Sequence, residues 1–105
     1  MQIIWSERAL ARRQAIEDYI FYSFGYEAYR SYLIAINEWK AEVSQYPQAG
    51  QIEPLLLGMR KEYRSRTIDR FSKCIYYIEG DRIVFVDWWD TRRSPIILKS
   101  GLNSI

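Results

Sequence analysis

The sequence contains no histidine and a single cysteine, Cys74, among its 105 residues. An internal disulfide is therefore impossible, and zinc sites built from several Cys and His ligands are excluded. The absence of histidine also excludes Ser-His-Asp and Cys-His catalysis and any histidine proton shuttle. We expect neither a metal site nor a cofactor.

Long hydrophobic runs are also missing. The longest of them, residues 74–78 and 83–86, are far too short to cross a bilayer. Residues 1–7 reach a charged side chain, Glu7, too early for the apolar region of a signal peptide. These absences predict a cytoplasmic protein that makes no membrane contact.

The residues that are present describe one well-filled domain, which we expect to span residues 1–105. Hydrophobic residues make up 49% of the chain and charged residues 27%, a balance typical of a globular domain with its own core. The chain holds four Trp, nine Tyr and four Phe, a high count for its length. Either the core is rich in aromatic rings, or some rings are exposed to bind a partner.

The formal net charge of +2 is small, but the charge is unevenly distributed. Residues 59–73 carry six basic side chains against two acidic ones, Glu62 and Asp69. Such a concentration suggests a surface that faces a polyanion. The alternative is a solvated strand edge that its charges keep soluble.

Local patterns predict an α+β fold with the element order βααβββ. An antiparallel helical hairpin would pack on a mostly antiparallel four-stranded sheet. Ser6 is a good helix N-cap, Gly25 a helix C-cap, and Gly80-Asp81 a two-residue hairpin turn. The expected elements are a strand at 2–5, helices at 7–24 and 28–46, and strands at 59–66, 71–78 and 82–89. The tail, residues 96–105, has no clear pattern.

Five segments between residues 3 and 95 together resemble the RelE/ParE superfamily of bacterial toxins, the plasmid stabilisation type. They are Trp5 with Ala9 and Ile16-(x)2-Tyr19-Ile20, then Tyr46-Pro47-Gln48-Ala49-Gly50, Met59-Arg60-Lys61-Glu62-Tyr63, Phe71-(x)4-Tyr76-Tyr77-Ile78, and the run from Val86 to Pro95. The resemblance implies the toxin of a type II toxin–antitoxin system, neutralised by a cognate antitoxin protein. Such toxins either cleave messenger RNA on the ribosome or poison DNA gyrase.

For a ribosome-dependent endoribonuclease, the resemblance implies a catalytic cluster of cations on the scissile phosphate. Carried over by position, its members are Arg64, Arg66, Lys73 and Arg93, with Arg60, Lys61 and Arg92 binding phosphate or nucleic acid. The spacing of Arg64 and Arg66 places both on one face of a strand. We expect the cluster to converge at one end of the sheet, where mutual repulsion would favour a neutral, reactive Lys73.

Alternative interpretations accompany these residues. The cations are also typical of a solvated strand face, and Arg92 alternatively pairs with Asp90 or Asp87. Asp90 stands where some nuclease relatives have histidine, and Tyr63 is the tyrosine left for proton transfer. The alternative function is therefore a gyrase poison or a binding module without nuclease chemistry.

Two groups of rings also carry an interpretation. We expect the Trp88-Trp89 pair to supply one core ring and one covering ring rather than to stack on bases. Around the predicted helix junction, Tyr22, Tyr26 and Tyr29 form an apolar surface that an antitoxin would cover.

Overall fold

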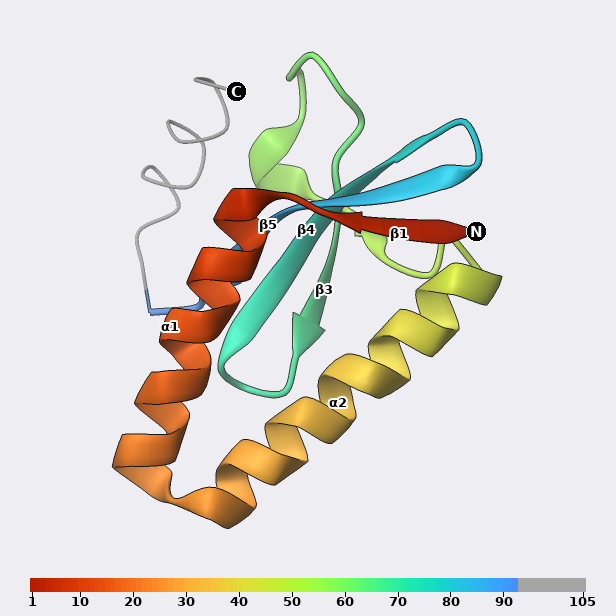
Figure 1. Ribbon diagram of the computed structural model, residues 1–105. Helices are drawn as coiled ribbons and strands as arrows, with labels where there is room; N and C mark the ends of the chain where they lie inside the picture. The colour runs from red at the N-terminus through yellow and green to blue at the C-terminus, as the bar shows by residue number, and fades with distance from the viewer. Residues whose placement is uncertain (93–105) are drawn as a thin grey trace.

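In the computed structural model, which describes residues 1–92, two helices lie against one face of a five-stranded sheet (Figure 1). The elements are β1 (Gln2–Trp5), α1 (Glu7–Phe24), α2 (Tyr26–Gln45), β2 (Gln51–Ile52), the 3-10 helix η1 (Pro54–Leu56), β3 (Arg64–Ile68), β4 (Ser72–Glu79) and β5 (Arg82–Asp90). Arg93 and the predicted tail at 96–105 lie outside the described residues.

The strand order is β1-β5-β4-β3-β2. β1 pairs in parallel with β5, and the three remaining pairs are antiparallel. The predicted α+β class is therefore confirmed, but the count of four strands is wrong. The added strand, β2, has two residues, Gln51 and Ile52, opposite Ser65 and Arg64. Two residues have no alternation to detect, so the sequence predicts no strand at this segment.

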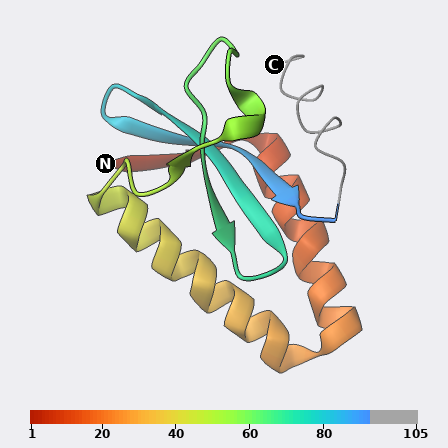
Figure 2. The same ribbon diagram turned by 180° about the vertical axis from the view of Figure 1, so that it is seen from behind.

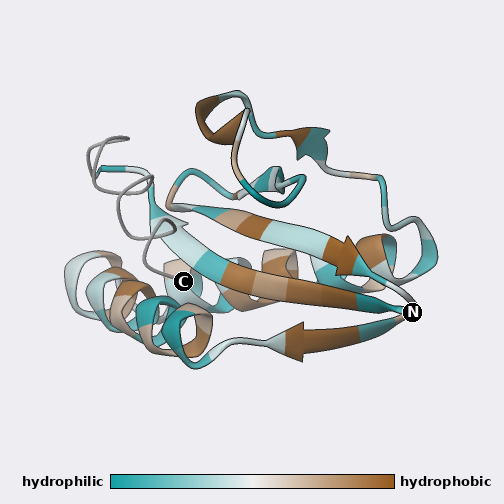
Figure 3. Ribbon diagram, turned by 90° about the horizontal axis from the view of Figure 1, so that it is seen from above, coloured by the Kyte–Doolittle hydropathy of each residue, from teal (hydrophilic) through white to brown (hydrophobic). Residues whose placement is uncertain are grey.

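The start of the predicted strand at 59–66 is also corrected. β3 begins only at Arg64 and continues to Ile68. The preceding residues belong to a segment, 53–63, that crosses the face of the sheet opposite the helices (Figures 2 and 3). Within this segment Leu56 is 2% exposed and packs with Tyr63, Ile75, Val86 and Trp89. The segment therefore covers part of that face.

The helix boundaries follow the predicted caps. The Ser6 side chain accepts a hydrogen bond from the N–H of Ala9 at 3.0 Å, and Gly25 ends α1 with φ of +93°. The second helix starts one residue later, so α1 and α2 leave Gly25 as the two arms of a V (Figure 1). None of the described helices is long and apolar enough to span a membrane.

Core packing divides the sheet into two unequal faces. On the helix face, Trp39 contacts Tyr76 and Phe85, with ring centroids 5.6 and 6.4 Å apart. Trp88 is fully buried on this face, whereas Trp89 is buried on the opposite face with the 53–63 segment. The prediction that this pair supplies a core ring and a covering ring is confirmed, since the alternation of β5 sends the two rings to opposite faces.

Candidate functional site

Arg64 and Arg66 lie on one face of β3, as their spacing predicts. They are opposite Tyr76 and Cys74, which belong to the core cluster on the helix face. The Arg64 guanidinium donates to the carbonyl oxygen of Gly50 at 2.8 Å and lies 3.6 Å from the Glu62 carboxylate. With its side chain only 16% exposed, Arg64 mainly holds the loop that follows α2.

Arg66 is held between α2 and the same loop. Its Nη2 atom lies 2.6 Å from the Glu42 carboxylate and donates to the Ala49 carbonyl oxygen at 3.0 Å. Its guanidinium also lies 4.5 Å from the ring centroid of Trp39. The charge of Arg66 is thus already engaged by a carboxylate, a carbonyl and an aromatic face.

Lys73 lies on the other face of the sheet. It stands opposite Thr67, one position along from the Arg66–Cys74 pair, so the alternation of the strands turns it away from both arginines. Its Nζ atom lies 2.6 Å from Oε1 of Glu53. The expectation that the cluster converges is wrong for Lys73, and its close charged neighbour is a carboxylate rather than another cation.

Glu53 is a buried carboxylate, 1% exposed, at the start of η1. Besides Lys73, its oxygens accept hydrogen bonds from Ser65 Oγ and from the N–H of Leu55, both at 2.9 Å. Burial by itself would raise the pKa of Glu53, but the hydrogen bonds from Lys73, Leu55 and Ser65 outweigh it and lower the pKa. Glu53 is therefore ionised, and it anchors the 53–63 segment to β3 and β4.

The predicted binding residues are spread over the surface. Arg60 and Lys61 are exposed in the 53–63 segment, where Lys61 lies 4.4 Å from the Tyr77 ring centroid and 3.7 Å from the Glu79 carboxylate. Arg92 forms a bidentate ion pair with Asp90, with distances of 3.0 and 2.6 Å. The alternative interpretation of Arg92, a pair with Asp90, is confirmed. The catalytic and binding roles of these residues, and of Arg93, stay predictions.

Within residues 1–92, groups suited to proton transfer near neutral pH are not assembled around the described cations. Tyr63 is 6% exposed, and its pKa is raised, first by burial and then by Tyr77. The Glu62 carboxylate lies 3.6 Å from Arg64, and the Asp69 carboxylate accepts the N–H of Arg70 at 2.8 Å. A general acid works best with a pKa near the operating pH, and the shift of Tyr63 is in the wrong direction.

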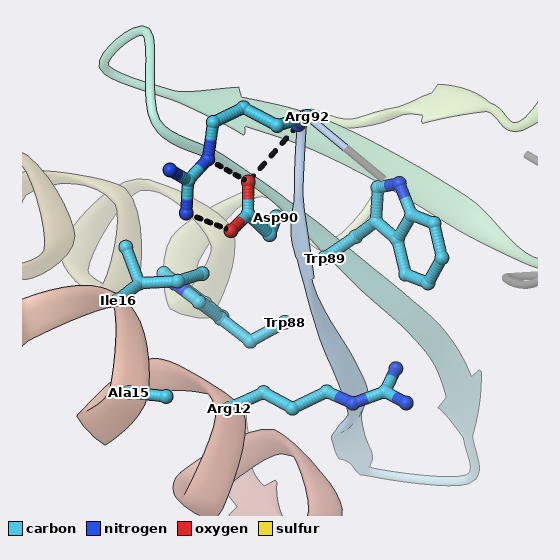
Figure 4. A pocket seen from close by; sticks show the side chains of 7 residues that line it. All are labelled: Arg12, Ala15, Ile16, Trp88, Trp89, Asp90 and Arg92. Atoms are coloured by element: carbon cyan, nitrogen blue, oxygen red, sulfur yellow. Dashed lines mark hydrogen bonds and ion pairs between the residues drawn. The ribbon is translucent and has the colours of Figure 1, made fainter. Parts of the chain in front are cut away.

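A different set of residues forms a depression on the described surface, where α1 passes the end of β5 (Figure 4). Two adjoining pockets of about 130 and 170 Å³ share Ile16, Asp90 and Arg92. Their outer walls are formed by Arg12, Ala15, Trp88 and Trp89 on one side and by Tyr19, Arg70, Phe71 and Thr91 on the other. We call the two pockets together the α1–β5 groove.

Arg12 closes one end of this groove. Its Nη1 atom lies 3.0 and 2.9 Å from the two carboxylate oxygens of Asp87, which is fully buried. Asp87 also accepts the N–H of Trp88 at 2.8 Å, next to a register shift between β4 and β5. The ion pair thus compensates the irregular backbone of a β-bulge and fixes α1 against β5.

At the other end, two arginines lie on aromatic rings. The guanidinium of Arg92 is 3.8 Å from the ring centroid of Tyr19, and that of Arg70 is 4.9 Å from Phe71 and 5.4 Å from Phe24. These contacts hold both cations at the rim of the groove.

Sequence reasoning missed the groove. Arg12 is separated from Asp87 by 75 positions, and Arg70 was counted only as part of the basic stretch. Helical spacing does place Arg12 one turn before Ile16, on the face that meets the sheet. This position of Arg12 was the local signal in the sequence. It indicates that the arginine has a buried acidic partner, but it does not identify that partner.

The chain shares its fold with solved structures of ParE and YoeB proteins, which confirms the fold that the resemblance implies. The chain is similar to a solved structure of the chromosomal ParDE TA system from P. aeruginosa, at 21% identity and a TM-score of 0.67, over 86% of this chain and 95% of that one. It is also similar to the YoeB/ParE toxin from Agrobacterium tumefaciens, at 19% identity and 0.58, over 86% and 98% of the two chains.

A third similar structure is the YoeB-YefM complex from Staphylococcus aureus, at 17% identity and a TM-score of 0.54, over 85% and 94% of the two chains. No protein-family model and no curated protein sequence matches the chain. At these identities the likeness establishes the fold, and the activity has to be argued from the residues.

Proposed function

We propose that this protein is the toxin of a type II toxin–antitoxin pair, and that it arrests growth by binding its target rather than by cleaving messenger RNA. The similar structures include a ParDE TA system and a heterotetrameric YoeB-YefM toxin-antitoxin complex, which supports an antitoxin partner. DNA gyrase is the target that the RelE/ParE resemblance offers for a toxin without nuclease chemistry. Both gyrase and the ribosome are cytoplasmic.

One observation favours target binding over messenger RNA cleavage. Each described cation of the predicted catalytic set already has a protein oxygen within 3.0 Å: Arg64 has the carbonyl of Gly50, Arg66 has Glu42 and Lys73 has Glu53. Electrostatic catalysis of phosphate cleavage requires donors aimed at the developing charge of the substrate. Donors engaged in internal pairs on two opposite faces of a sheet do not meet that requirement.

Induced expression tests the proposal. We expect growth arrest with intact ribosome-bound messenger RNA by primer extension, together with DNA breaks and trapped gyrase–DNA complexes. Co-expression of the protein encoded by the neighbouring gene should restore growth, and that protein should co-purify with this chain. Growth without arrest, under confirmed expression of folded protein, would refute the toxin assignment.

Matched variants separate the two modes. In the binding mode, Lys73→Ala and Arg93→Ala leave messenger RNA as intact as the wild type does. Cuts in the decoding site that appear with the wild type and vanish in both variants would establish the nuclease instead. Loss of one preorganised charge-stabilising donor typically lowers such a rate by about 10²- to 10³-fold, a loss that primer extension detects easily.

A further inference from the structure

The α1–β5 groove combines an apolar floor with a charged rim. Ile16 is 4% exposed, and Tyr19 and Phe71, both half-buried, complete the floor of the larger pocket. At about 170 Å³, that pocket is smaller than the roughly 300 Å³ at which small-molecule sites begin. Its size suits a single side chain of a partner better than a cofactor.

Among the described residues, 1–92, the charges around the groove do not cancel. Arg12 is paired with Asp87 at 2.9 Å, and Arg92 with Asp90 at 2.6 Å. Arg70 is exposed, contacts the rings of Phe24 and Phe71, and has no carboxylate partner within residues 1–92. The rim therefore presents one cation held in place by aromatic rings and available for a carboxylate from outside.

We infer that the α1–β5 groove binds a segment of the antitoxin that carries an Asp or Glu next to an aliphatic or aromatic side chain. The carboxylate pairs with Arg70, and the apolar side chain enters the pocket over Ile16 and Phe71. This inference rests on the proposed function, since it names the chemistry by which the antitoxin recognises this chain.

Charge complementarity favours a peptide over an RNA strand. One unpaired guanidinium matches one carboxylate, whereas a nucleic acid would bring several phosphates to a groove that also contains the Asp90 carboxylate. The two other arginines, Arg12 and Arg92, already form ion pairs with Asp87 and Asp90. A wedge of apolar surface with one charged anchor is typical of a protein–protein contact.

Charge variants of the full chain test this, with the purified antitoxin encoded by the neighbouring gene as the probe. We expect Arg70→Ala to weaken binding about tenfold, which corresponds to roughly 1.4 kcal/mol, and Arg70→Glu to weaken it about a hundredfold. The matched control is Arg82→Glu, an exposed arginine near the opposite end of β5 that lies 3.8 Å from Glu79. It should change the affinity less than twofold, with all variants checked for an unchanged circular dichroism spectrum.

Hydrogen exchange supplies a second measurement. We expect the amides of residues 12–19 and 88–92 to be more protected in the complex than in the chain alone. Equal protection in both would overturn the inference, because the chain itself or a second copy would then already fill the groove. Arg70→Glu could also bind the antitoxin with wild-type affinity but lose crosslinking to RNA. That result would overturn the inference in favour of an RNA occupant.

The same experiments distinguish this inference from the proposed function. If the wild type and Arg70→Glu bind the antitoxin equally, the toxin assignment stands and the groove is not the docking site. If the wild type itself does not bind, the toxin–antitoxin assignment and this inference both fall.

Discussion

The Nζ atom of Lys73 lies 2.6 Å from Oε1 of Glu53, on the face of the sheet opposite Arg66. This pair links the middle of the sheet to the start of η1 and thereby holds the 53–63 segment, with its buried Leu56, against Trp89 on the sheet. Lys73, which the resemblance predicts to act on a phosphate, thus anchors the 53–63 segment through Glu53. The Lys73 side chain is 22% exposed and the Glu53 side chain only 1%, so the pair is largely, but not completely, shielded from solvent.

Glu53→Gln should destabilise the protein by about 2 kcal/mol. The amide keeps the size of the side chain but leaves the Lys73 ammonium without a counter-charge. Removing one charge of a largely buried ion pair lowers the free energy of unfolding more than removing one charge of an exposed pair. Glu42→Gln is the matched control, because the Glu42–Arg66 pair is more exposed and its loss should destabilise the protein clearly less. Urea unfolding curves measure both, and equal losses would contradict the argument.

The contribution of Glu53 should also depend on pH. Because the folded-state pKa is lowered below the ordinary value of 4.5, the stabilisation is present in full above that pH and is lost as the pH falls through the folded-state pKa. The difference in unfolding free energy between the wild type and Glu53→Gln should be constant near neutral pH and should shrink below pH 4.5. A difference that grows on acidification would have the wrong sign.

Asp87→Asn should cost about 3 kcal/mol. Asp87 is fully buried, and its carboxylate accepts hydrogen bonds from Arg12 and from the N–H of Trp88 at the bulge. Removing the charge leaves the Arg12 guanidinium unpaired against β5. Asp18→Asn is an exposed change on α1, where the Asp18 carboxylate accepts a hydrogen bond from Gln14 at 3.0 Å, and it should stay within about 0.5 kcal/mol. Thermal unfolding of the two variants provides the comparison.

Gly50→Ala should destabilise the protein by about 2 kcal/mol through overpacking. A Cβ atom built on Gly50 would lie 2.6 Å from the hydroxyl of Tyr76 and 2.8 Å from the carbonyl oxygen of Ser65. Tyr76 is fully buried and donates to Pro47, so it cannot move aside freely. Unchanged denaturant midpoints would show that the loop after α2 relaxes without cost.

The thiol of Cys74 should not react in the native protein. It is completely buried, and burial raises its pKa, so almost no thiolate exists at neutral pH. An aromatic disulfide reagent should therefore label Cys74 only as fast as the chain opens, and labelling should accelerate with added denaturant. Rapid stoichiometric labelling without denaturant would contradict this.

The helices and the long strands were predictable from the sequence because their signals are local. Ser6 and Gly25 mark the two ends of α1 through their own side-chain and backbone chemistry. On α2 the buried residues Tyr32, Ile36 and Val43 recur at helical spacing. β2 was not predicted, because a two-residue strand is defined only by its pairing with a partner strand, here β3. The start of β3 was misplaced for a related reason: residues before Arg64 pack on the sheet rather than pair within it.

The sequence by itself determined which cations exist and that Arg64 and Arg66 share a face, because strand alternation is a property of one chain segment. The side on which Lys73 lies depends on the register across the turn, where Asp69 adopts φ of +53° and Thr67 pairs with Lys73. That register, and with it the ion pair to Glu53, is decided by tertiary packing. The α1–β5 groove is likewise a tertiary product, since the Arg12–Asp87 contact joins residues 75 positions apart and Arg70 reaches the rim only when the β3–β4 turn lies beside α1.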